Sequence, residues 1–131
     1  MSLEENKALV RRFHDLNLAD MDAILAPSFI GHDLGGHTWN RDEHKKFLAE
    51  DLASFADLHD AIHDIVAEGD YVVVRFTRSG IFRAKYQDYA PTNKTVNFPV
   101  MELIRIVNGK IVEIWDYNDN SQVIRALKGE E

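Results

Sequence analysis

The strongest constraint on the fold is a change in the spacing of apolar residues after about residue 56. Upstream, apolar side chains recur at helical intervals; downstream they alternate with polar ones, and β-branched and aromatic residues dominate. Four such segments follow one another, at 59–68, 71–82, 95–107 and 111–118. Asn108-Gly109 favours a type I′ hairpin, because both central positions of that turn need a positive φ angle, and Glu68-Gly69-Asp70 is a second tight-turn sequence. The sequence therefore predicts four successive strands, the last three as an antiparallel meander.

Helices are predicted on both sides of this strand region. The spacing of a capping box, in which Ser or Asn is followed three residues later by Glu, marks the start of two long helices at Ser2 and Asn40. A short helix is expected at 21–25 and a short strand at Phe29 and Ile30, and the last helix is expected to have Asn120 or Ser121 as its cap. Helices followed by long antiparallel strands are typical of an α+β fold, with the helices on one face of a sheet that bends around them and leaves a cavity.

Composition narrows the class of protein. The 131 residues suit one domain, 1–131, and no apolar run is long enough for a membrane span, so no membrane partner is expected. The 22 acidic residues outnumber the 15 basic ones, and the net charge of −7 disfavours nucleic acid as a partner. The chain has no cysteine, which excludes disulfides and thiolate chemistry, and its first residues do not resemble a secretory signal, so a cytoplasmic location is expected.

The six histidines raise the question of a metal site. His59 and His63 have the four-residue spacing of a helical metal pair, but they fall in a predicted strand. At the rise of a strand, positions i and i+4 are about 13 Å apart, which is too far for two ligands of one ion. The sequence therefore predicts no metal site.

Short motifs occur in a characteristic order along nearly the whole chain. They are Asn6-Lys7 with Leu9 to Phe13; Leu25-Ala26-Pro27 with Phe29 and His32-Asp33; Val66 to Asp70; Pro91-Thr92 with Lys94; and the closing run Arg105 to Asp119, which includes Trp115. In order and spacing they resemble the SnoaL-like polyketide cyclases of the nuclear transport factor 2-like superfamily. The resemblance implies a cone-shaped fold: a curved, mostly antiparallel sheet wrapped around about three helices, with a short C-terminal helix and an apolar pocket inside. It also implies a homodimer formed through the outer face of the sheet.

Asp119 is the candidate general acid/base. It lies four residues after Trp115, and the resemblance assigns to it the role of the pocket aspartate of the cyclases. Counting by two along the strand places Asp119, Tyr117 and Trp115 on one face, where the two aromatic rings could provide the apolar surroundings that raise the pKa of a carboxylate. The alternative is that Asp119 caps the last helix.

Three further residues are candidates for contact with a substrate. The resemblance places His32 at the pocket mouth, where an imidazole can bind a carbonyl or move a proton; the alternative is a local hydrogen bond to Asp33. Glu102 is the one acid in an apolar strand, which predicts either a pocket residue or an ion pair with Arg75 on a neighbouring strand. Trp39, in the Gly-rich loop before the second long helix, either contacts a ligand or covers the edge of the core.

Together these observations predict a cofactor-free enzyme that acts on a small hydrophobic carbonyl compound. Asp119 is the expected general base and His32 its polar partner, while Glu102 or Tyr117 orients the substrate. The nearest reaction that the resemblance implies is polyketide cyclisation of the aldol type. Two alternatives stay open: a noncatalytic protein that binds a hydrophobic ligand, and a hydrolase or isomerase in which the carboxylate activates water.

Overall fold

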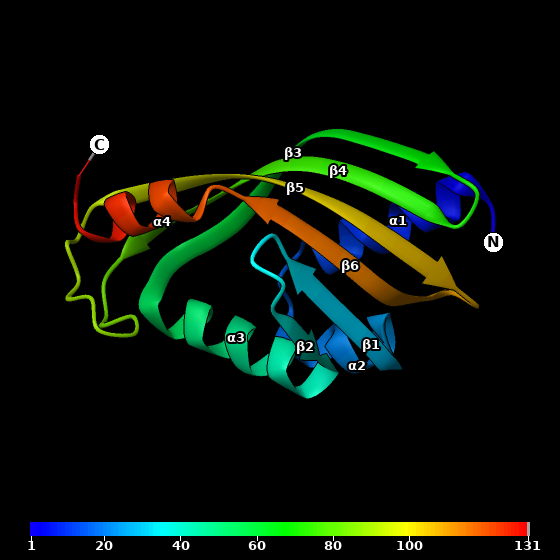
Figure 1. Cartoon of the computed structure of the whole chain (residues 1–131), viewed down its shortest axis with the longest axis horizontal. Coiled ribbons are helices and arrows are strands. Elements are labelled where there is room, and N and C mark those ends of the chain that lie inside the picture. Colours follow the sequence, from blue (N-terminus) through cyan, green and yellow to red (C-terminus); the bar gives the residue numbers. More distant parts are fainter. Residues whose placement is uncertain (131) are drawn as a thin grey trace.

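The computed structural model of the chain describes residues 1–130 (Figure 1). Its helices and strands appear in the order that the sequence predicts, with two short elements added. In chain order they are α1 (Leu3–Phe13), the 3-10 helix η1 (Leu18–Asp20), α2 (Met21–Ile24), β1 (Leu25–Asp33), β2 (Thr38–Asn40), α3 (Arg41–Ser54), β3 (Phe55–Glu68), β4 (Tyr71–Phe82), β5 (Thr95–Val107), β6 (Lys110–Asn118) and α4 (Asn120–Leu127).

The strands form one sheet in the order β2-β1-β6-β5-β4-β3. Strands β3 to β6 are joined in sequence as antiparallel neighbours, which confirms the predicted meander, and Asn108 and Gly109 both have positive φ in the β5–β6 turn. Strand β1 pairs with β6 in parallel, and the three-residue β2 closes that edge. The predicted α+β fold with a mostly antiparallel sheet is therefore confirmed.

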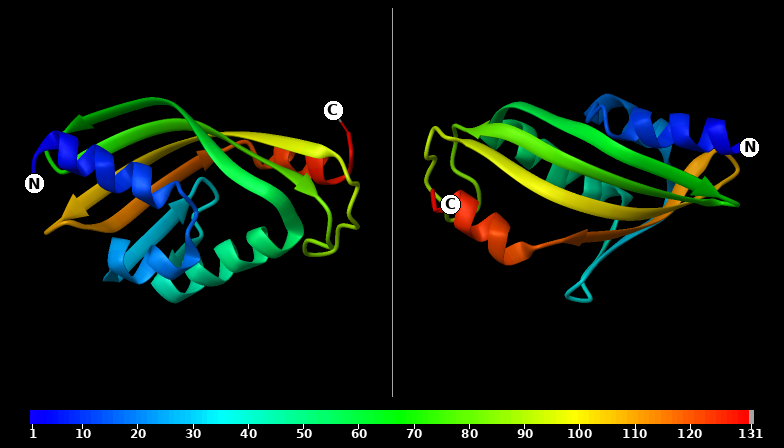
Figure 2. Two further views of the ribbon diagram at one scale, coloured as in Figure 1. Left: turned by 180° about the vertical axis from the view of Figure 1, so that it is seen from behind. Right: turned by 90° about the horizontal axis from the view of Figure 1, so that it is seen from above.

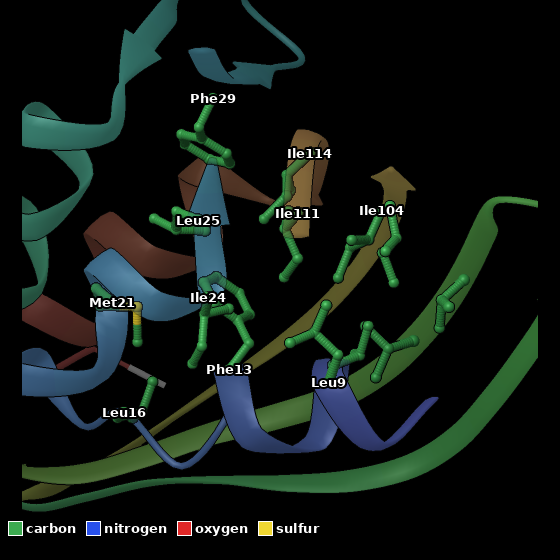
Figure 3. Packing of buried hydrophobic residues seen from close by; sticks show 14 of the residues in the cluster. Leu9, Phe13, Leu16, Met21, Ile24, Leu25, Phe29, Ile104, Ile111 and Ile114 are labelled. Carbon is green, nitrogen blue, oxygen red and sulfur yellow. The ribbon is translucent and has the colours of Figure 1, made fainter. Parts of the chain in front are cut away.

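The sheet arches, and α1, α2 and α3 lie on its concave side (Figures 1 and 2). The main core fills the space between α1, β1 and the middle of the sheet. Figure 3 shows Leu9 and Phe13 of α1 facing Ile104, Ile111 and Ile114 of the sheet, and all five are buried. A second, smaller core lies at the end of the sheet near α4, where it consists of Phe55, Phe82, Val96 and Leu127. The molecule thus has two apolar centres on the same face of one sheet.

The helix starts follow from local hydrogen bonds. Both predicted capping boxes are present, because the Ser2 side chain accepts from the backbone N–H of Glu5 and the Asn40 side chain accepts from that of Glu43. The predicted cap of the last helix is wrong by one or two residues. Asp119 caps α4, since its carboxylate accepts the free backbone N–H groups at the start of the helix.

A β-bulge in β6 decides which of its side chains face the helices. Arg105 of β5 pairs with Glu113, but the next residue, Ile106, pairs with Ile111, so Val112 is an extra residue on the β6 side. As a result Ile111 and Ile114 are both buried, although they are three positions apart. Beyond the bulge, the inward row of β6 continues with every second residue after position 114.

The outer face of the sheet carries exposed apolar side chains. Tyr71, Val73, Met101 and Tyr117 come from three neighbouring strands, and each exposes more than a third of its surface.

No helix within residues 1–130 has the length and apolar character of a membrane span.

Candidate active site

A cavity of about 230 Å³ lies between the two cores. Apolar side chains from both cores form much of its wall, among them Phe13 and Leu48 from one side and Phe55 and Leu127 from the other. Its polar side chains come from α3, from three central strands and from the loop after β4. They are His44, Asp51, Arg78, Tyr86, Glu102, Asp116 and Asn118.

Two carboxyl groups meet at the floor of the cavity. Glu102 and Asp116 are direct partners on the adjacent strands β5 and β6, and both point to the helix side. Burial raises the pKa of Asp116, and the neighbouring Glu102 charge raises it further, to about 8. The amide of Asn118 donates to Asp116 Oδ1 over 3.1 Å. The pair therefore holds one proton and one negative charge at neutral pH.

A buried ionic network keeps Glu102 charged. Burial, the largest single effect, would raise the pKa of Glu102, but the charge and contact of His14, together with Arg78 and Asp116, outweigh it and lower the pKa. His14 Nε2 lies 2.9 Å from Glu102 Oε1, although the two groups are not aligned for a hydrogen bond, and His14 Nδ1 is 2.7 Å from Asp60 Oδ2. Burial alone would lower the pKa of His14, yet Glu102 and Asp60 raise it to about 9. His14 is therefore an imidazolium ion at neutral pH.

Arg78 connects this network to the cavity. Its Nε and Nη2 atoms donate to the two carboxylate oxygens of Asp60 over 2.7 and 2.9 Å, which is the bidentate geometry of a strong arginine–carboxylate pair. Two cations, Arg78 and His14, thus face two carboxylates, Asp60 and Glu102. Asp116 has no cation of its own within this group, which is why it retains its proton.

A third acid, Asp51, lies at the α3 side of the cavity. Asp51 Oδ2 is 3.6 Å from Arg78 Nη1, and burial raises the pKa of Asp51 because this one distant cation does not offset the loss of water. The Tyr86 phenol lies beside Asp51. Burial, followed by the Asp51 charge, raises the pKa of Tyr86, so the phenol is a neutral hydrogen-bond donor.

The structure does not place Asp119 in the cavity, so the predicted position of this residue is wrong. Asp119 is exposed, and its carboxylate accepts from the Ser121 hydroxyl and from the backbone N–H groups of Ser121 and Gln122. These hydrogen bonds lower its pKa, whereas a general base needs a raised one. The structure instead agrees with the alternative, in which Asp119 caps the last helix.

His32, Trp115 and Tyr117 also lie outside the cavity, on the outer face of the sheet. His32 Nε2 is 2.7 Å from Glu113 Oε2, and the His32 ring stacks on Trp115 with centroids 5.3 Å apart. Tyr117 exposes 46% of its surface. The prediction that Trp115 and Tyr117 share a pocket face with a catalytic acid fails because that face was chosen from Asp119, whereas the inward row of β6 beyond the bulge consists of Ile114, Asp116 and Asn118.

Glu102 and Trp39 do line the cavity, and their role in binding a substrate stays a prediction. The proposed ion pair between Glu102 and Arg75 is wrong. Arg75 lies on the other face of β4, where its Nε donates to Asp64 over 2.7 Å.

Most of the polar site was not predicted from the sequence, although the periodicity of apolar residues contains a signal for it. Arg78 follows Val74 and Phe76 at intervals of two, so it shares their buried face of β4. His14, the C-cap residue of α1, lies four positions after Val10 and so continues the apolar stripe of the helix. Polar residues that fall on an apolar face are the feature to look for. Within residues 1–130, no three His, Asp or Glu side chains are arranged to hold a metal ion.

The fold and the site define a class of protein: a curved α+β sheet whose helices enclose a small cavity with ionisable groups on its floor, as in the ketosteroid isomerase-like and nuclear transport factor 2-like folds. A sequence model of the SnoaL-like polyketide cyclases matches residues 6–127, and the chain therefore belongs to that family. Among curated proteins, none matches the chain.

Solved structures of similar proteins agree with this assignment. AclR, a proposed hydroxylase from Streptomyces galilaeus, is 25% identical with a TM-score of 0.85, over 98% of this chain and 83% of that one. IdmH, a proposed polyketide cyclase from Streptomyces antibioticus, is 24% identical with a TM-score of 0.80, over 98% and 99% of the two chains. A ketosteroid isomerase-like protein from Catenulispora acidiphila, solved with trimethylamine, is 20% identical with a TM-score of 0.72, over 100% and 96%. At such identities the last two show the fold alone.

Proposed function

We propose that this protein is a cofactor-free enzyme that forms or rearranges carbon–carbon bonds in a small hydrophobic carbonyl compound, by the aldol chemistry of polyketide cyclisation. The observation that carries the proposal is the position of Asp116, a carboxyl group with a pKa of about 8 that opens on an apolar cavity. Membership of the SnoaL-like family supports the reaction class. Asp116 takes the role of general acid/base that the sequence suggested for Asp119.

The raised pKa fits Asp116 to both halves of an aldol reaction. As carboxylate, it takes a proton from the carbon next to a carbonyl group, and the enolate formed attacks a second carbonyl in the same molecule. The protonated Asp116 then returns that proton to the alkoxide oxygen, so the enzyme ends in its starting state. With a pKa of about 8, about a tenth of the Asp116 groups are ionised at pH 7, and their basicity is far above that of an ordinary aspartate.

The buried ionic network tunes this acid without touching the substrate. His14 and Arg78 keep Glu102 ionised, and the Glu102 charge makes a second negative charge on Asp116 unfavourable. The Asn118 amide holds Asp116 Oδ1 in place at the floor of the cavity. In this scheme Glu102 is a positioning residue and Asp116 is the catalytic one.

The dimensions of the cavity favour a compact substrate. Its volume of about 230 Å³ is below the several hundred Å³ that hold drug-sized ligands, and its wall is mainly aromatic and aliphatic. One or two rings with a ketone group fit this description better than an extended tetracyclic skeleton.

Exchange of carbon-bound hydrogen tests the proposal without knowledge of the natural substrate. In D2O, the wild type should accelerate the loss of the C1 protons of 2-tetralone, a bicyclic ketone, as followed by proton NMR. Removal of a general base typically costs a factor of about 10² to 10⁴, which is the loss expected for Asp116→Asn. The matched control is Asp119→Asn, a neighbouring aspartate outside the cavity, which should keep wild-type exchange.

The pH profile gives a second readout. Because the base must be ionised, the exchange rate should rise about tenfold per pH unit below the pKa of Asp116 and level off above pH 8. A noncatalytic binder would accelerate no exchange at any pH. Wild-type exchange equal to that of Asp116→Asn, on both 2-tetralone and acetophenone, would overturn the proposal.

A further inference from the structure

A histidine on α3 is held in one orientation at the cavity wall. His44 lies between the rings of Phe13 and Phe29, with centroids 5.4 Å away from each, and it lines the cavity. The indole Nε1–H of Trp39 donates a hydrogen bond to His44 Nδ1 over 3.1 Å. An indole nitrogen only donates, so His44 Nδ1 must carry a lone pair rather than a proton.

The tautomer of His44 follows from this contact. In a neutral imidazole one ring nitrogen carries the proton, and since Nδ1 accepts from Trp39, the proton is on Nε2. Burial lowers the pKa of His44 to about 4, and the positive charges of Arg78 and His14 lower it too, while Glu102 opposes them. The ring therefore stays neutral at physiological pH, with one N–H group and no net charge.

The Trp39 ring that sets this tautomer is itself fixed by the backbone of β1. Trp39 on β2 pairs with Gly31 on β1, and a Cβ atom added at Gly31 would lie 2.1 Å from the Trp39 ring atom Cε2. The indole thus lies directly against the Gly31 backbone, and the side chain of any other residue at position 31 would clash with it. The Phe47 ring also packs edge-on against the Trp39 indole, with ring centroids 6.3 Å apart. A series of contacts therefore runs from Gly31 through Trp39 to His44, which lines the cavity.

We infer that His44 is the hydrogen-bond donor to the substrate's carbonyl oxygen, through Nε2–H, with Trp39 as the residue that positions it. The inference rests on the proposed function and adds the group that stabilises the enolate oxygen while Asp116 handles the proton. A neutral donor suits this task, because its proton is not transferred to the oxygen, as in enzymes in which a neutral imidazole polarises a carbonyl. It also defines the ligand: a hydrophobic molecule with a hydrogen-bond acceptor, not a protonated amine.

The tautomer is tested by NMR on the protein itself. Long-range proton–nitrogen correlation spectra of ¹⁵N-labelled wild type, with His44→Gln to assign the ring, should show His44 as the neutral Nε2–H form from pH 5.5 to 8. In Trp39→Phe the Nδ1 resonance should move toward that of a free lone pair. An Nδ1–H tautomer, or an imidazolium ring at pH 6, would overturn the inference.

Binding of a matched ligand pair tests the donor role. Acetophenone and ethylbenzene have similar size and shape, but only the first has a carbonyl oxygen. Acetophenone should shift the His44 Nε2–H resonance and bind about fivefold to tenfold tighter than ethylbenzene, the range expected for one net hydrogen bond. In the double variant Trp39→Phe/His44→Phe, which leaves no indole N–H unpaired, this ratio should fall to near one.

The outcomes separate this inference from the proposed function. A ratio unchanged in the double variant would overturn the role of His44, even if Asp116→Asn still abolished proton exchange. The converse result is that acetophenone shifts the His44 Nε2–H resonance in a protein that catalyses no proton exchange. That result would support His44 as the hydrogen-bond donor and overturn the proposed enzymatic function. The Asp119→Asn variant, changed outside the cavity, should retain the wild-type ratio.

Discussion

Replacing Asp116 by asparagine should change how the stability of the fold depends on pH. In the folded protein the pKa of Asp116 is about 8, against an ordinary value of 3.8. Between these values the folded state holds a proton that the unfolded chain has lost, so the free energy of unfolding falls as the pH rises. Asparagine does not titrate, and its amide can still donate to Glu102. The free energy of unfolding of the variant should therefore not fall in this way as the pH rises.

The size of the effect follows from the same two pKa values. A difference of about 4 pKa units corresponds to ~6 kcal/mol at most. Water in the cavity screens Asp116, and Glu102 titrates together with it, so we expect about 2–3 kcal/mol. Urea unfolding at pH 4.5, 6, 7 and 8.5 should show the stability of Asp116→Asn relative to wild type increasing by that amount across the series. His14 has a raised pKa, so its contribution to the free energy of unfolding decreases above pH 6.5. This decrease occurs in both proteins and does not contribute to the difference in stability between them.

Asp119→Asn is again the control. Its carboxylate has a lowered pKa, so it is ionised in folded and unfolded chains throughout this pH range, and its difference from wild type should be flat. An equally flat difference for Asp116→Asn, within about 0.5 kcal/mol, would refute the assignment of a raised pKa to Asp116 and with it the physical basis of the proposed general base.

Three further results are expected. Glu102→Gln removes the charge that holds the Asp116 pKa up, so the midpoint of the exchange profile should move down by about one pH unit or more, and an unmoved midpoint would contradict this coupling. Asp119→Ala should cost about 1 kcal/mol of stability in urea unfolding while proton exchange persists; loss of exchange would return Asp119 to the mechanism. We expect the exposed outer face around Tyr71 and Tyr117 to pair two subunits, so Met101→Lys should convert a dimer into a monomer in light scattering, and a monomeric wild type would contradict this expectation.

Local sequence patterns predicted the architecture well because its main features are local. The strands β3 to β6 are long, and short turns join β3 to β4 and β5 to β6, so period and turn chemistry together favour an antiparallel meander. Two features escaped prediction for physical reasons. The parallel pairing of β1 with β6 joins residues about eighty positions apart, and β2 is three residues long, too short to show any period.

The site was less predictable, because it depends on which way each side chain faces. A one-residue error in the alternation exchanges the two faces of a strand, and a count that crosses the bulge at Val112 makes that error. Trp115 and Tyr117 were assigned to the cavity face because Asp119 was expected there, and Asp116, on the opposite face of β6, was not identified as a site residue. Asp60, in contrast, alternates with Ile62 in the part of β3 from His59 to Ile62, which pairs without a bulge, and its inward position could have been predicted from that residue.

The extra residue in β6 also bears on how chemistry can vary among proteins of this shape. If the strand were shortened by one residue near Val112, Trp115 and Tyr117 would turn toward the helices and Asp116 would turn toward solvent. A single insertion or deletion could thus exchange an acidic floor for an aromatic one while nearly every other contact survived. A tryptophan and an aspartate at fixed separation therefore do not identify the reactive group in such chains, unless the position of the bulge is known as well.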